Sequence, residues 1–247
     1  MRFSMERLLD EKVAIVTGGG KELGFAIASG LAVDGARVLV VSRSEERARI
    51  AVAKIRDAGG MAEPHVDDIT TPEAAARILR AALERFGGVD ILVNSAGIFV
   101  WKKFLDLTVE DWNQSIATNL TAAFHLTQVA ARTMIERERG GSIINIASIH
   151  SFAADPHVAA QCASKAGLVG LTRAAAEALR EFDIRVNAIA PGAIEPDSAT
   201  RRGETPRAKV TQADVASLAI YLASNLARSI TGATLEAYGS TRLVIRS

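Results

Sequence analysis

The sequence predicts an α/β fold, a doubly wound parallel sheet with helices on both faces. Short runs of apolar and β-branched residues alternate with longer helical patterns along the chain. These runs are apolar on both faces, which is typical of strands covered by helices on each side. A chain of 247 residues with 49% hydrophobic content can bury one large core. No linker rich in proline, glycine or serine and no repeat divides the chain, so we expect one domain.

The order of the elements follows from these runs and from the helix signals between them. Thr71-Pro72-Glu73 reads as an N-cap, a proline at the first helical position and an acid in the first turn. Thr108 with Asp111 resembles a capping box. Repeated strand–helix–strand units with right-handed crossovers give a parallel sheet of about seven strands. Five of the runs are the clearest strands: 13–17, 37–41, 91–93, 142–147 and 185–190.

Composition excludes several other classes of function. A formal net charge of +1 gives no electrostatic reason to expect nucleic acid or a membrane surface as a partner. Residues 1–12 lack the apolar core of a signal peptide, and no segment approaches the ~20 apolar residues of a membrane helix. Cys162 is the only cysteine, which suits a reducing cytoplasm. The histidines His65, His125, His150 and His157 show no metal-ligand spacing, so no metal site is expected.

A glycine cluster follows the first predicted strand and opens a helix. It reads Thr17-Gly18-Gly19-Gly20-Lys21-Glu22-Leu23-Gly24. Glycines at this position let the backbone approach a pyrophosphate, and the helix N-terminus supplies free N–H groups with a favourable dipole. Ligands of such sheets bind beyond the carboxyl ends of the strands, and the motifs below fall at such ends.

With these residues the chain resembles the short-chain dehydrogenase/reductase family from about residue 12 to residue 243. The glycine motif, Asp68, Asn94-Ser95-Ala96-Gly97 and Pro191-Gly192 occur in the family's order and spacing. The resemblance implies a Rossmann-type domain over 1–247, with an N-terminal extension at 1–11 and a short substrate lid at 193–211. It also implies a nicotinamide cofactor held by Thr17, Gly18, Gly20, Lys21, Leu23, Gly24, Ser42, Arg43, Asp68, Asn94, Ala96, Gly97, Lys165, Pro191 and Gly192.

The residues that follow the second strand favour NADP over NAD. Val41 is followed by Ser42 and Arg43, with no acid to accept hydrogen bonds from an adenosine ribose. Arg43 with Lys21 would suit a 2′-phosphate, as in family members that prefer NADP. The alternative is an ordinary pair of solvated bases.

Glu22 departs from the family pattern, because it stands where the middle glycine of the motif belongs. A carboxylate ~4 Å from a phosphate would cost on the order of 4 kcal/mol at an effective dielectric near 20. Glu22 could instead occupy the pyrophosphate position at its own helix N-terminus. The alternative is that its side chain turns to solvent or pairs with a neighbouring base.

The resemblance also implies three catalytic residues and shows one missing. Asn119 would help hold a water in the proton relay, Ser148 would bind the substrate carbonyl, and Lys165 would hold the nicotinamide ribose. The family's proton donor is a tyrosine four residues before that lysine, where this chain has Gln161. An amide has no acid form near neutral pH, so the tyrosine-dependent mechanism is expected to be lost or very slow.

Other groups could supply the proton. Lys165 acting through water is one, and His150 or His157 are others, although a loop histidine is more often a solvated residue. Cys162 is interpreted as a packing residue. Pro196 replaces the usual threonine that binds the carboxamide, which together with Glu22 places cofactor binding in doubt. The short lid carries Arg201, Arg202, Arg207 and Lys209, either for an anionic ligand or as a solvated charge run.

Three functions remain open at this point. The first is an NADP-preferring oxidoreductase of small-molecule carbonyls or alcohols with a substitute proton source. The second is a non-catalytic relative, a partner subunit or ligand sensor, and the third is non-redox hydration or elimination. The resemblance implies a homodimer or homotetramer formed by long helices at about 109–137 and 158–180. Ala163, Ala166, Gly167, Gly170 and Ala174 would allow close helix approach there, or could pack inside the subunit.

Overall fold

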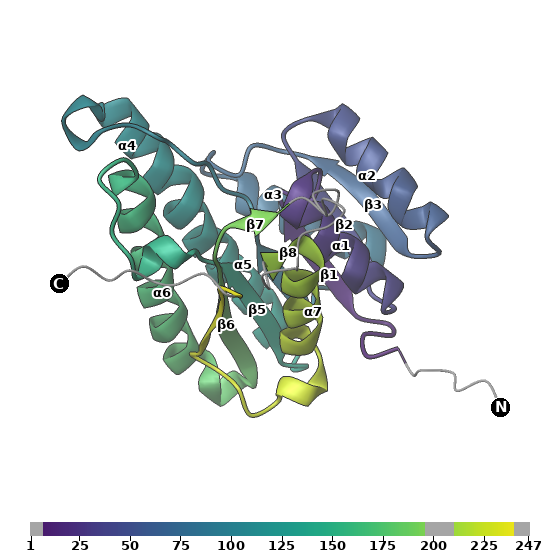
Figure 1. Ribbon diagram of the computed structural model, residues 1–247. Coiled ribbons are helices and arrows are strands. Elements are labelled where there is room, and N and C mark those ends of the chain that lie inside the picture. Colours follow the sequence, from purple (N-terminus) through teal and green to yellow (C-terminus); the bar gives the residue numbers. More distant parts are fainter. Residues whose placement is uncertain (1–6, 196–209, 240–247) are drawn as a thin grey trace.

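A seven-stranded parallel sheet forms the centre of the molecule, in the order β3-β2-β1-β4-β5-β6-β9 (Figure 1). The computed structural model describes residues 7–195 and 210–239. Every strand pair in this sheet is parallel. The predicted fold class is therefore confirmed. The strands are β1 (Val13–Thr17), β2 (Arg37–Ser42), β3 (Met61–Val66), β4 (Ile91–Asn94), β5 (Gly141–Ile146), β6 (Ile184–Pro191) and β9 (Thr234–Ala237).

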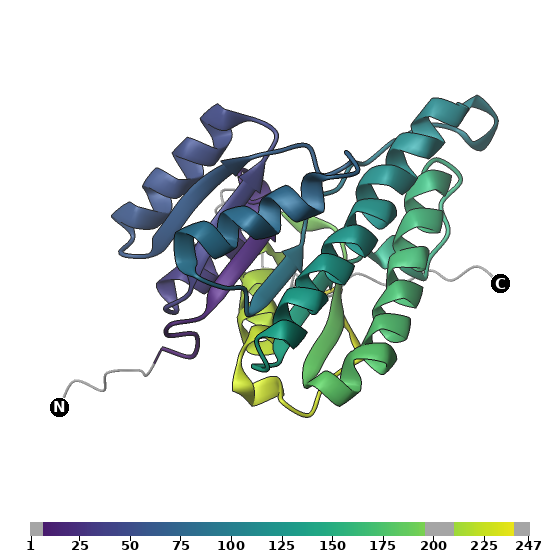
Figure 2. The same ribbon diagram turned by 180° about the vertical axis from the view of Figure 1, so that it is seen from behind.

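Helices cover both faces of the sheet. One face carries α1 (Glu22–Val33), α2 (Glu45–Asp57) and α7 (Gln212–Ala223), and α1 packs closely on α7. The opposite face, turned toward the viewer in Figure 2, carries α3 (Ala74–Phe86), α5 (Ala122–Glu136) and α6 (Ala159–Leu179). Each face has its own apolar cluster, and the strands contribute alternate residues to the two.

The central strands are buried because their side chains are apolar in both directions. All five residues of β1 are buried, with Ile15 in one cluster and Val16 in the other. Burial of an aliphatic side chain of this size contributes about 1.5–3 kcal/mol. The edge strand β3 is different, because it contains Pro64 and exposes Met61. A proline is tolerated at such an edge, where one side of the strand has no ladder partner.

One predicted helix start is wrong and the other is confirmed. Helix α3 begins at Ala74, so Pro72 is not its first residue and Thr71 is not its N-cap. The Thr71 hydroxyl is engaged elsewhere: it donates to the carbonyl of Asp68 and accepts from Arg77. The capping box of Thr108 with Asp111 is present at the start of α4 (Val109–Ile116).

The long helix expected at about 109–137 contains an irregularity that its sequence did not indicate. Between α4 and α5 the residues Ala117–Thr121 form a π-helical turn. Such turns insert one extra residue into a helix and occur frequently at functional sites. Asn119, one of the predicted catalytic residues, lies in the middle of this turn.

The predicted lid is described only at its two ends. Ile194–Glu195 forms β7 and pairs in parallel with β8 (Val210–Thr211). Pro196 and the lid bases Arg201, Arg202, Arg207 and Lys209 lie outside the described residues. Within 7–195 and 210–239, no helix is long and apolar enough to span a membrane.

Candidate active site and nucleotide pocket

The glycine turn between β1 and α1 is built by close backbone approaches. A Cβ at Gly24 would lie 2.2 Å from the carbonyl oxygen of Gly18, so only glycine fits there. Gly18 has φ +69°, and a Cβ on it would lie 2.9 Å from the Cα of Ala96. Helix α1 begins without a side-chain cap, which leaves its first N–H groups open to a ligand. This geometry is that of a phosphate-binding turn.

A cavity of about 260 Å³ lies beside this turn at the carboxyl ends of β1, β2, β3 and β4. It unites motifs that are far apart in the sequence and that the family resemblance assigned to the cofactor. The predicted residues that line it are Gly18, Gly20, Lys21, Ser42, Arg43, Asp68, Ala96 and Gly97.

Arg47 also lines this cavity, and the sequence analysis did not single it out. Arg47 lies in the first turn of α2, where its backbone N–H donates to the N-cap hydroxyl of Ser44 at 3.3 Å. A Cβ at Gly20 would lie 3.3 Å from the Cβ of Arg47, so this side chain starts next to the glycine turn. The sequence contained a signal for Arg47, because a base three residues after an N-cap lies in the first turn of a helix, and that turn begins at the carboxyl end of the preceding strand. Lys21, Arg43 and Arg47 thus give the cavity three bases.

Glu22 does not line the cavity beside the glycine turn. Its side chain is 71% exposed, and its Oε1 lies 3.4 Å from the Lys21 Nζ. The structure therefore shows the second of the two alternatives, in which the carboxylate turns to solvent and pairs with a neighbouring base. Its backbone keeps the glycine-like conformation of the motif, with φ +50°. A side chain in this left-handed region is strained by roughly 1–2 kcal/mol.

Glu22→Gly is therefore expected to stabilise the protein by about 1 kcal/mol, because the strain at a positive φ exceeds the entropy cost of glycine. It should also strengthen NADPH binding, because it removes a negative charge close to the phosphate turn. Urea denaturation and calorimetric titration measure the two effects. The control is Glu45→Gly, in the first turn of α2 with an ordinary helical backbone, which should lose stability. A loss of stability in Glu22→Gly would contradict this account.

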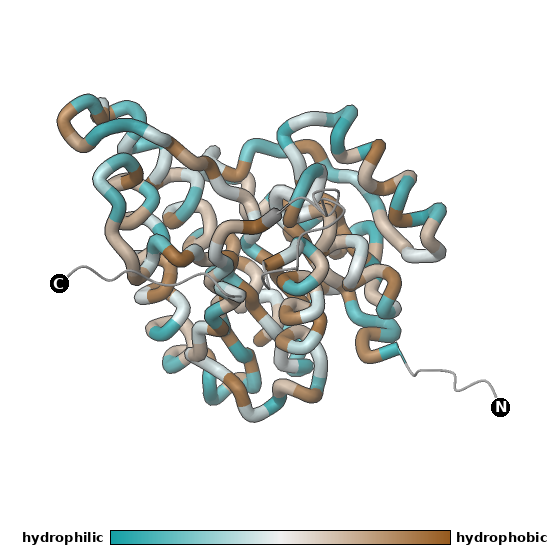
Figure 3. The backbone as a smooth tube through the Cα atoms, in the orientation of Figure 1, coloured by the Kyte–Doolittle hydropathy of each residue, from teal (hydrophilic) through white to brown (hydrophobic). Residues whose placement is uncertain are grey.

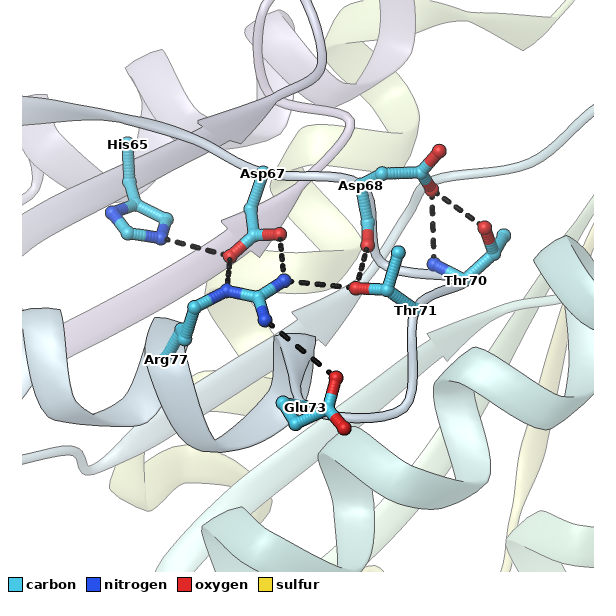
Figure 4. Close-up of polar contacts among 7 residues, drawn as sticks. All are labelled: His65, Asp67, Asp68, Thr70, Thr71, Glu73 and Arg77. Carbon is cyan, nitrogen blue, oxygen red and sulfur yellow. Dashed lines mark hydrogen bonds and ion pairs between the residues drawn. The ribbon is translucent and has the colours of Figure 1, made fainter.

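A polar network fixes the loop after β3, which forms one wall of the cavity (Figure 4). The Arg77 guanidinium donates to both oxygens of Asp67, at 2.9 and 2.6 Å. This hydrogen-bonded guanidinium holds the pKa of the Asp67 carboxyl below its usual value. Asp68 accepts the N–H and the hydroxyl of Thr70, which lower its pKa likewise. The predicted cofactor residue Asp68 is thus held as a carboxylate in a fixed position.

The other predicted cofactor residues support the pocket or lie apart from it. The Thr17 hydroxyl accepts the N–H groups of Ser95 and Ala96, both at 3.1 Å, and so ties two loops together. The Asn94 side chain is buried and donates to Asn145 and Thr127. Leu23 packs against the core. Pro191 ends β6, and the N–H of Gly192 donates to the carbonyl of Ala237.

Lys165 is buried, and it lies next to Gly97, which lines the cavity beside the glycine turn. Its Nζ donates to the carbonyl of Ile146 at 2.6 Å, and burial lowers the pKa of its ammonium group to about 8. A Cβ at Gly97 would lie 3.6 Å from this Nζ and 3.2 Å from Asn119 Oδ1. Two predicted site residues from separate elements, Lys165 of α6 and Asn119 of the π-helical turn, therefore meet beside Gly97.

Gln161 is buried and is held by Asn119. The Asn119 Nδ2 donates to Gln161 Oε1 at 3.1 Å and to Ser164 Oγ at 3.1 Å, while its Oδ1 accepts the N–H of Ile98 at 2.9 Å. With its oxygen toward Asn119, the Gln161 amide has its Nε2 available to donate to a carbonyl group. It can orient a substrate in this way but cannot protonate one.

Ser148 and the two histidines lie in the segment between β5 and α6. Ser148 caps the 3₁₀ turn η3 (Ile149–Ser151), and its Oγ accepts the N–H of His150 at 3.2 Å. The Nδ1 of His150 is buried and has no partner among the described residues. His157 stacks on Trp101 at 5.1 Å and lies 3.4 Å from Asp155. Cys162 only approaches the carbonyl of Ala153, as expected for a packing residue.

Tyr238 lies closer to the site than its position in the sequence suggested. It follows β9 and packs against Ala147 and Val169, one residue before Ser148 and one turn after Lys165. Its hydroxyl is buried without a hydrogen-bond partner among the described residues, and burial raises the pKa of Tyr238 to about 12. The parallel pairing of β6 with β9 produces this placement, which no local signal in the sequence could have indicated.

No group of His, Cys, Asp or Glu side chains suited to a metal ion occurs in the part of the chain that the structure describes. The candidate site consists of the glycine turn, the three bases Lys21, Arg43 and Arg47, and the cluster of Lys165, Asn119 and Gln161. Its open face lies at the carboxyl ends of the strands.

Comparison with known proteins decides the family. Residues 12–207 match the sequence model of the family described as short chain dehydrogenase. The chain belongs to the short-chain dehydrogenase/reductase family. It is 36% identical to L-rhamnose-1-dehydrogenase of Scheffersomyces stipitis, over 94% of this chain and 96% of that protein. It is also 36% identical to the 3-oxoacyl-acyl-carrier-protein reductase of Vibrio cholerae, over 96% and 99% of the two chains.

Solved structures of this short-chain dehydrogenase/reductase family agree with the fold. A short-chain type dehydrogenase/reductase from Mycobacterium marinum superposes with a TM-score of 0.87 and 32% identity, covering 97% of this chain and 98% of that one. A short-chain dehydrogenase from Mycobacterium smegmatis gives 0.85 and 29%, over 96% and 95%. The relatives are dehydrogenases and reductases, a class of oxidoreductase that usually binds NAD or NADP.

Proposed function

We propose that this protein is an NADP-preferring oxidoreductase that acts on a small carbonyl or alcohol substrate, with the family's tyrosine-dependent step lost or very slow. The observation that carries the proposal is the nucleotide cavity, which three bases line and from which Glu22 is absent. Sequence position alone left Glu22 as a potential occupant of the phosphate site. Its exposed pairing with Lys21 supports cofactor binding instead.

The residues present fit a dinucleotide phosphate. The uncapped start of α1 would bind the pyrophosphate, and Arg43 and Arg47 would face the 2′-phosphate. The loop of Asp68 would hold the adenine end, and Lys165 the ribose at the other end. When bound, NADPH would supply the hydride. The contribution of Pro196 stays a prediction, because that residue is outside the described part of the chain.

The chain's own residues would handle the proton. We propose Lys165 as the first candidate donor, because burial brings the pKa of its ammonium group close to neutral pH, where acid catalysis is most effective. His150 remains second, since its buried Nδ1 has no partner in the described part of the chain. His157 is less suited, because Trp101 and Asp155 already contact its ring. Gln161 and Ser148 would orient the carbonyl group.

The cofactor preference can be tested through the two arginines. Arg43→Gln and Arg47→Gln are each expected to weaken NADPH binding by about tenfold, because each removes one charge-assisted contact to the 2′-phosphate, and to leave NADH affinity unchanged. Calorimetric titration with both nucleotides measures this. Arg49→Gln is the matched control, since Arg49 lies on the same helix as Arg47 but pairs with Glu45 in solvent. Equal losses for NADPH and NADH would overturn the assignment of a 2′-phosphate site.

The activity itself is tested by following NADPH oxidation with a panel of small ketones and aldehydes. The names of three relatives refer to rhamnose, a hydroxysteroid and 3-oxoacyl-acyl-carrier-protein, so they do not point to one substrate. We expect slow turnover that depends on Lys165. Tight NADPH binding without any hydride transfer across the panel would favour the alternative of a ligand sensor.

We also propose a homo-oligomer formed by the outer faces of α4, α5 and α6. Ala166, Gly170 and Ala174 are exposed on α6, whereas a Cβ at Gly167 would lie 2.8 Å from Leu120 within the subunit. The loop before α4 protrudes with hydrophobic residues (Figure 3), and Leu105 is 93% exposed. Such an apolar surface is typical of an interface.

Gly170→Arg is expected to convert the oligomer to monomers. A Cβ at Gly170 meets nothing within 4 Å, so the arginine fits the isolated subunit but would block a second copy. Light scattering after size-exclusion chromatography measures the mass. Ala76→Arg, on the exposed side of α3, is the control and should keep the assembly. A Gly170→Arg protein of unchanged mass would contradict this interface.

A further inference from the structure

A second and larger cavity lies at the opposite edge of the sheet from the nucleotide site. It measures about 440 Å³, and residues that begin β4, β5 and β6 line it together with the turns that follow α6 and α7. Because the strands are parallel, their amino ends lie at the edge remote from the glycine turn and Lys165. Neither the family's cofactor nor its substrate has a reason to reach this edge.

The lining of this cavity is strongly basic. It has two acids, Asp90 and Asp183, and the five bases Lys12, Arg139, Arg180, Arg185 and Arg228. Asp90 is already engaged, since its Oδ2 accepts the N–H of Val13 at 2.8 Å. Within the described residues no ion pair joins any of the five bases to either acid, and only Arg180 has a carboxylate partner, Glu177 outside the cavity.

Arg185 is the central feature of this lining. It lies in β6, and its Nη2 donates to the carbonyl of Ser224 at 3.2 Å, near the end of α7. Carbonyl groups at helix ends attract bases, which accounts for this one contact. The Nη1 of the same guanidinium is buried and has no partner in the described parts of the chain. A buried donor of a charged group without an acceptor is costly, and an anion in the cavity would offset the positive charge of this guanidinium, which has no carboxylate partner among the described residues.

The two loops that close the cavity are held together closely. Gly140 has φ +64°, and a Cβ on it would lie 2.7 Å from the carbonyl oxygen of Asp183. This approach places Arg139 and the start of β5 next to the start of β6, so bases from separate elements surround one space. The cavity volume falls in the range of small-molecule sites.

We propose that this cavity is a binding site for a small phosphate-bearing anion, separate from the nucleotide pocket. Guanidinium groups match phosphate oxygens through paired N–H donors, which makes phosphate a better ligand here than a neutral molecule. Arg185 is the partly buried base of the site, and the exposed side chains of Arg139 and Arg228 would contact the ligand.

Calorimetric titration with inorganic pyrophosphate at physiological salt tests the proposal. The glycine turn and the bases of the nucleotide pocket could also bind pyrophosphate, so the titration is repeated in the Lys21→Glu/Arg43→Gln/Arg47→Gln protein. This protein removes the three bases and adds a carboxylate at the start of α1, which repels an anion there, and its affinity for pyrophosphate should be retained. Arg139→Gln/Arg228→Gln should weaken binding by at least about tenfold, because each variant residue removes a charge-assisted contact. Both arginines are exposed, so this protein should fold as the parent does, which its urea midpoint verifies.

Arg80→Gln/Arg132→Gln is the matched control, because it removes two exposed arginines that do not line either cavity. Arg185→Lys provides a second line of evidence, since it keeps the charge but loses the paired donors and should weaken binding severalfold. The proposal is overturned if pyrophosphate gives no saturable heat. It is also overturned if the Lys21→Glu/Arg43→Gln/Arg47→Gln protein no longer binds pyrophosphate while the Arg139→Gln/Arg228→Gln protein still does. NADPH affinity is measured separately, so failure of the proposed oxidoreductase would leave this result intact.

Discussion

Gln161→Tyr combined with Glu22→Gly is expected to raise the rate of NADPH-dependent carbonyl reduction by about 10²–10⁴-fold. Position 161 already has the surroundings that a proton donor needs. It is buried, Asn119 contacts it at 3.1 Å, and Lys165 lies one helical turn further along α6. A tyrosine there would gain an acidic hydroxyl close to a cation, which the glutamine amide cannot replace. The gain corresponds to about 3–5 kcal/mol of activation free energy.

Two further proteins show whether the hydroxyl is responsible. Gln161→Phe with Glu22→Gly should stay as slow as Glu22→Gly alone, since phenylalanine has the ring without the acid. Tyr238→Phe in the parent protein should leave the residual rate unchanged if Lys165 supplies the proton. If a tyrosine variant folds and binds NADPH but shows no increase in rate, then the lid and Pro196, and not the missing hydroxyl, limit turnover.

The second large effect is a gain in stability between about pH 8 and pH 10.5 that depends on Lys165. Burial lowers the pKa of its ammonium group from 10.5 to about 8, so in this interval the unfolded chain binds a proton that the folded chain has lost. Stability therefore rises with pH through this interval and is flat below it, where both states are charged. The full difference is about 3 kcal/mol, or about 1.4 kcal/mol for each pH unit.

Urea denaturation at several pH values between 7 and 9.5 measures this gain. Lys165→Met should abolish most of it, since methionine does not titrate. Lys103→Met, at an exposed lysine before η1 (Phe104–Asp106), is the control and should retain the parent slope. A parent protein with no rise in stability above pH 8 would contradict the buried, uncompensated position of the Lys165 ammonium group.

Much of the fold could be predicted from the sequence because the central strands are apolar on both faces. The runs at 13–17, 37–41, 91–93 and 185–190 all lie in strands of the sheet, and the run at 142–147 extends one residue beyond the end of β5. The long α6 was expected at 158–180 and is found at Ala159–Leu179. Edge strands are harder, because β3 contains Pro64 and β9 has only partly buried or exposed residues. Their pairing depends on neighbours far away in the sequence.

The candidate site could be predicted where the local backbone geometry requires one residue type. Gly18 and Gly24 are required by backbone approaches of less than 3 Å, and a sequence motif records such requirements. Tyr238 was missed because the pairing of β6 with β9 brings it to the site, whereas Arg47 had a local signal, a base three residues after an N-cap, that was not used. The direction of the Glu22 side chain could not be decided from the sequence either. The helix N-terminus and the Lys21 ammonium group both attract its negative charge. The π-helical turn at Asn119 has no composition signal that distinguishes it from an ordinary helix.

The central claim is that this chain retains a nucleotide site of the NADP type despite its altered catalytic residues. Calorimetric titration of the purified protein with NADPH and with NADH tests it most directly. We expect one site with micromolar affinity for NADPH and an affinity for NADH at least about tenfold weaker, as Arg43 and Arg47 facing a 2′-phosphate would produce. No binding of either nucleotide at millimolar concentration would contradict the account.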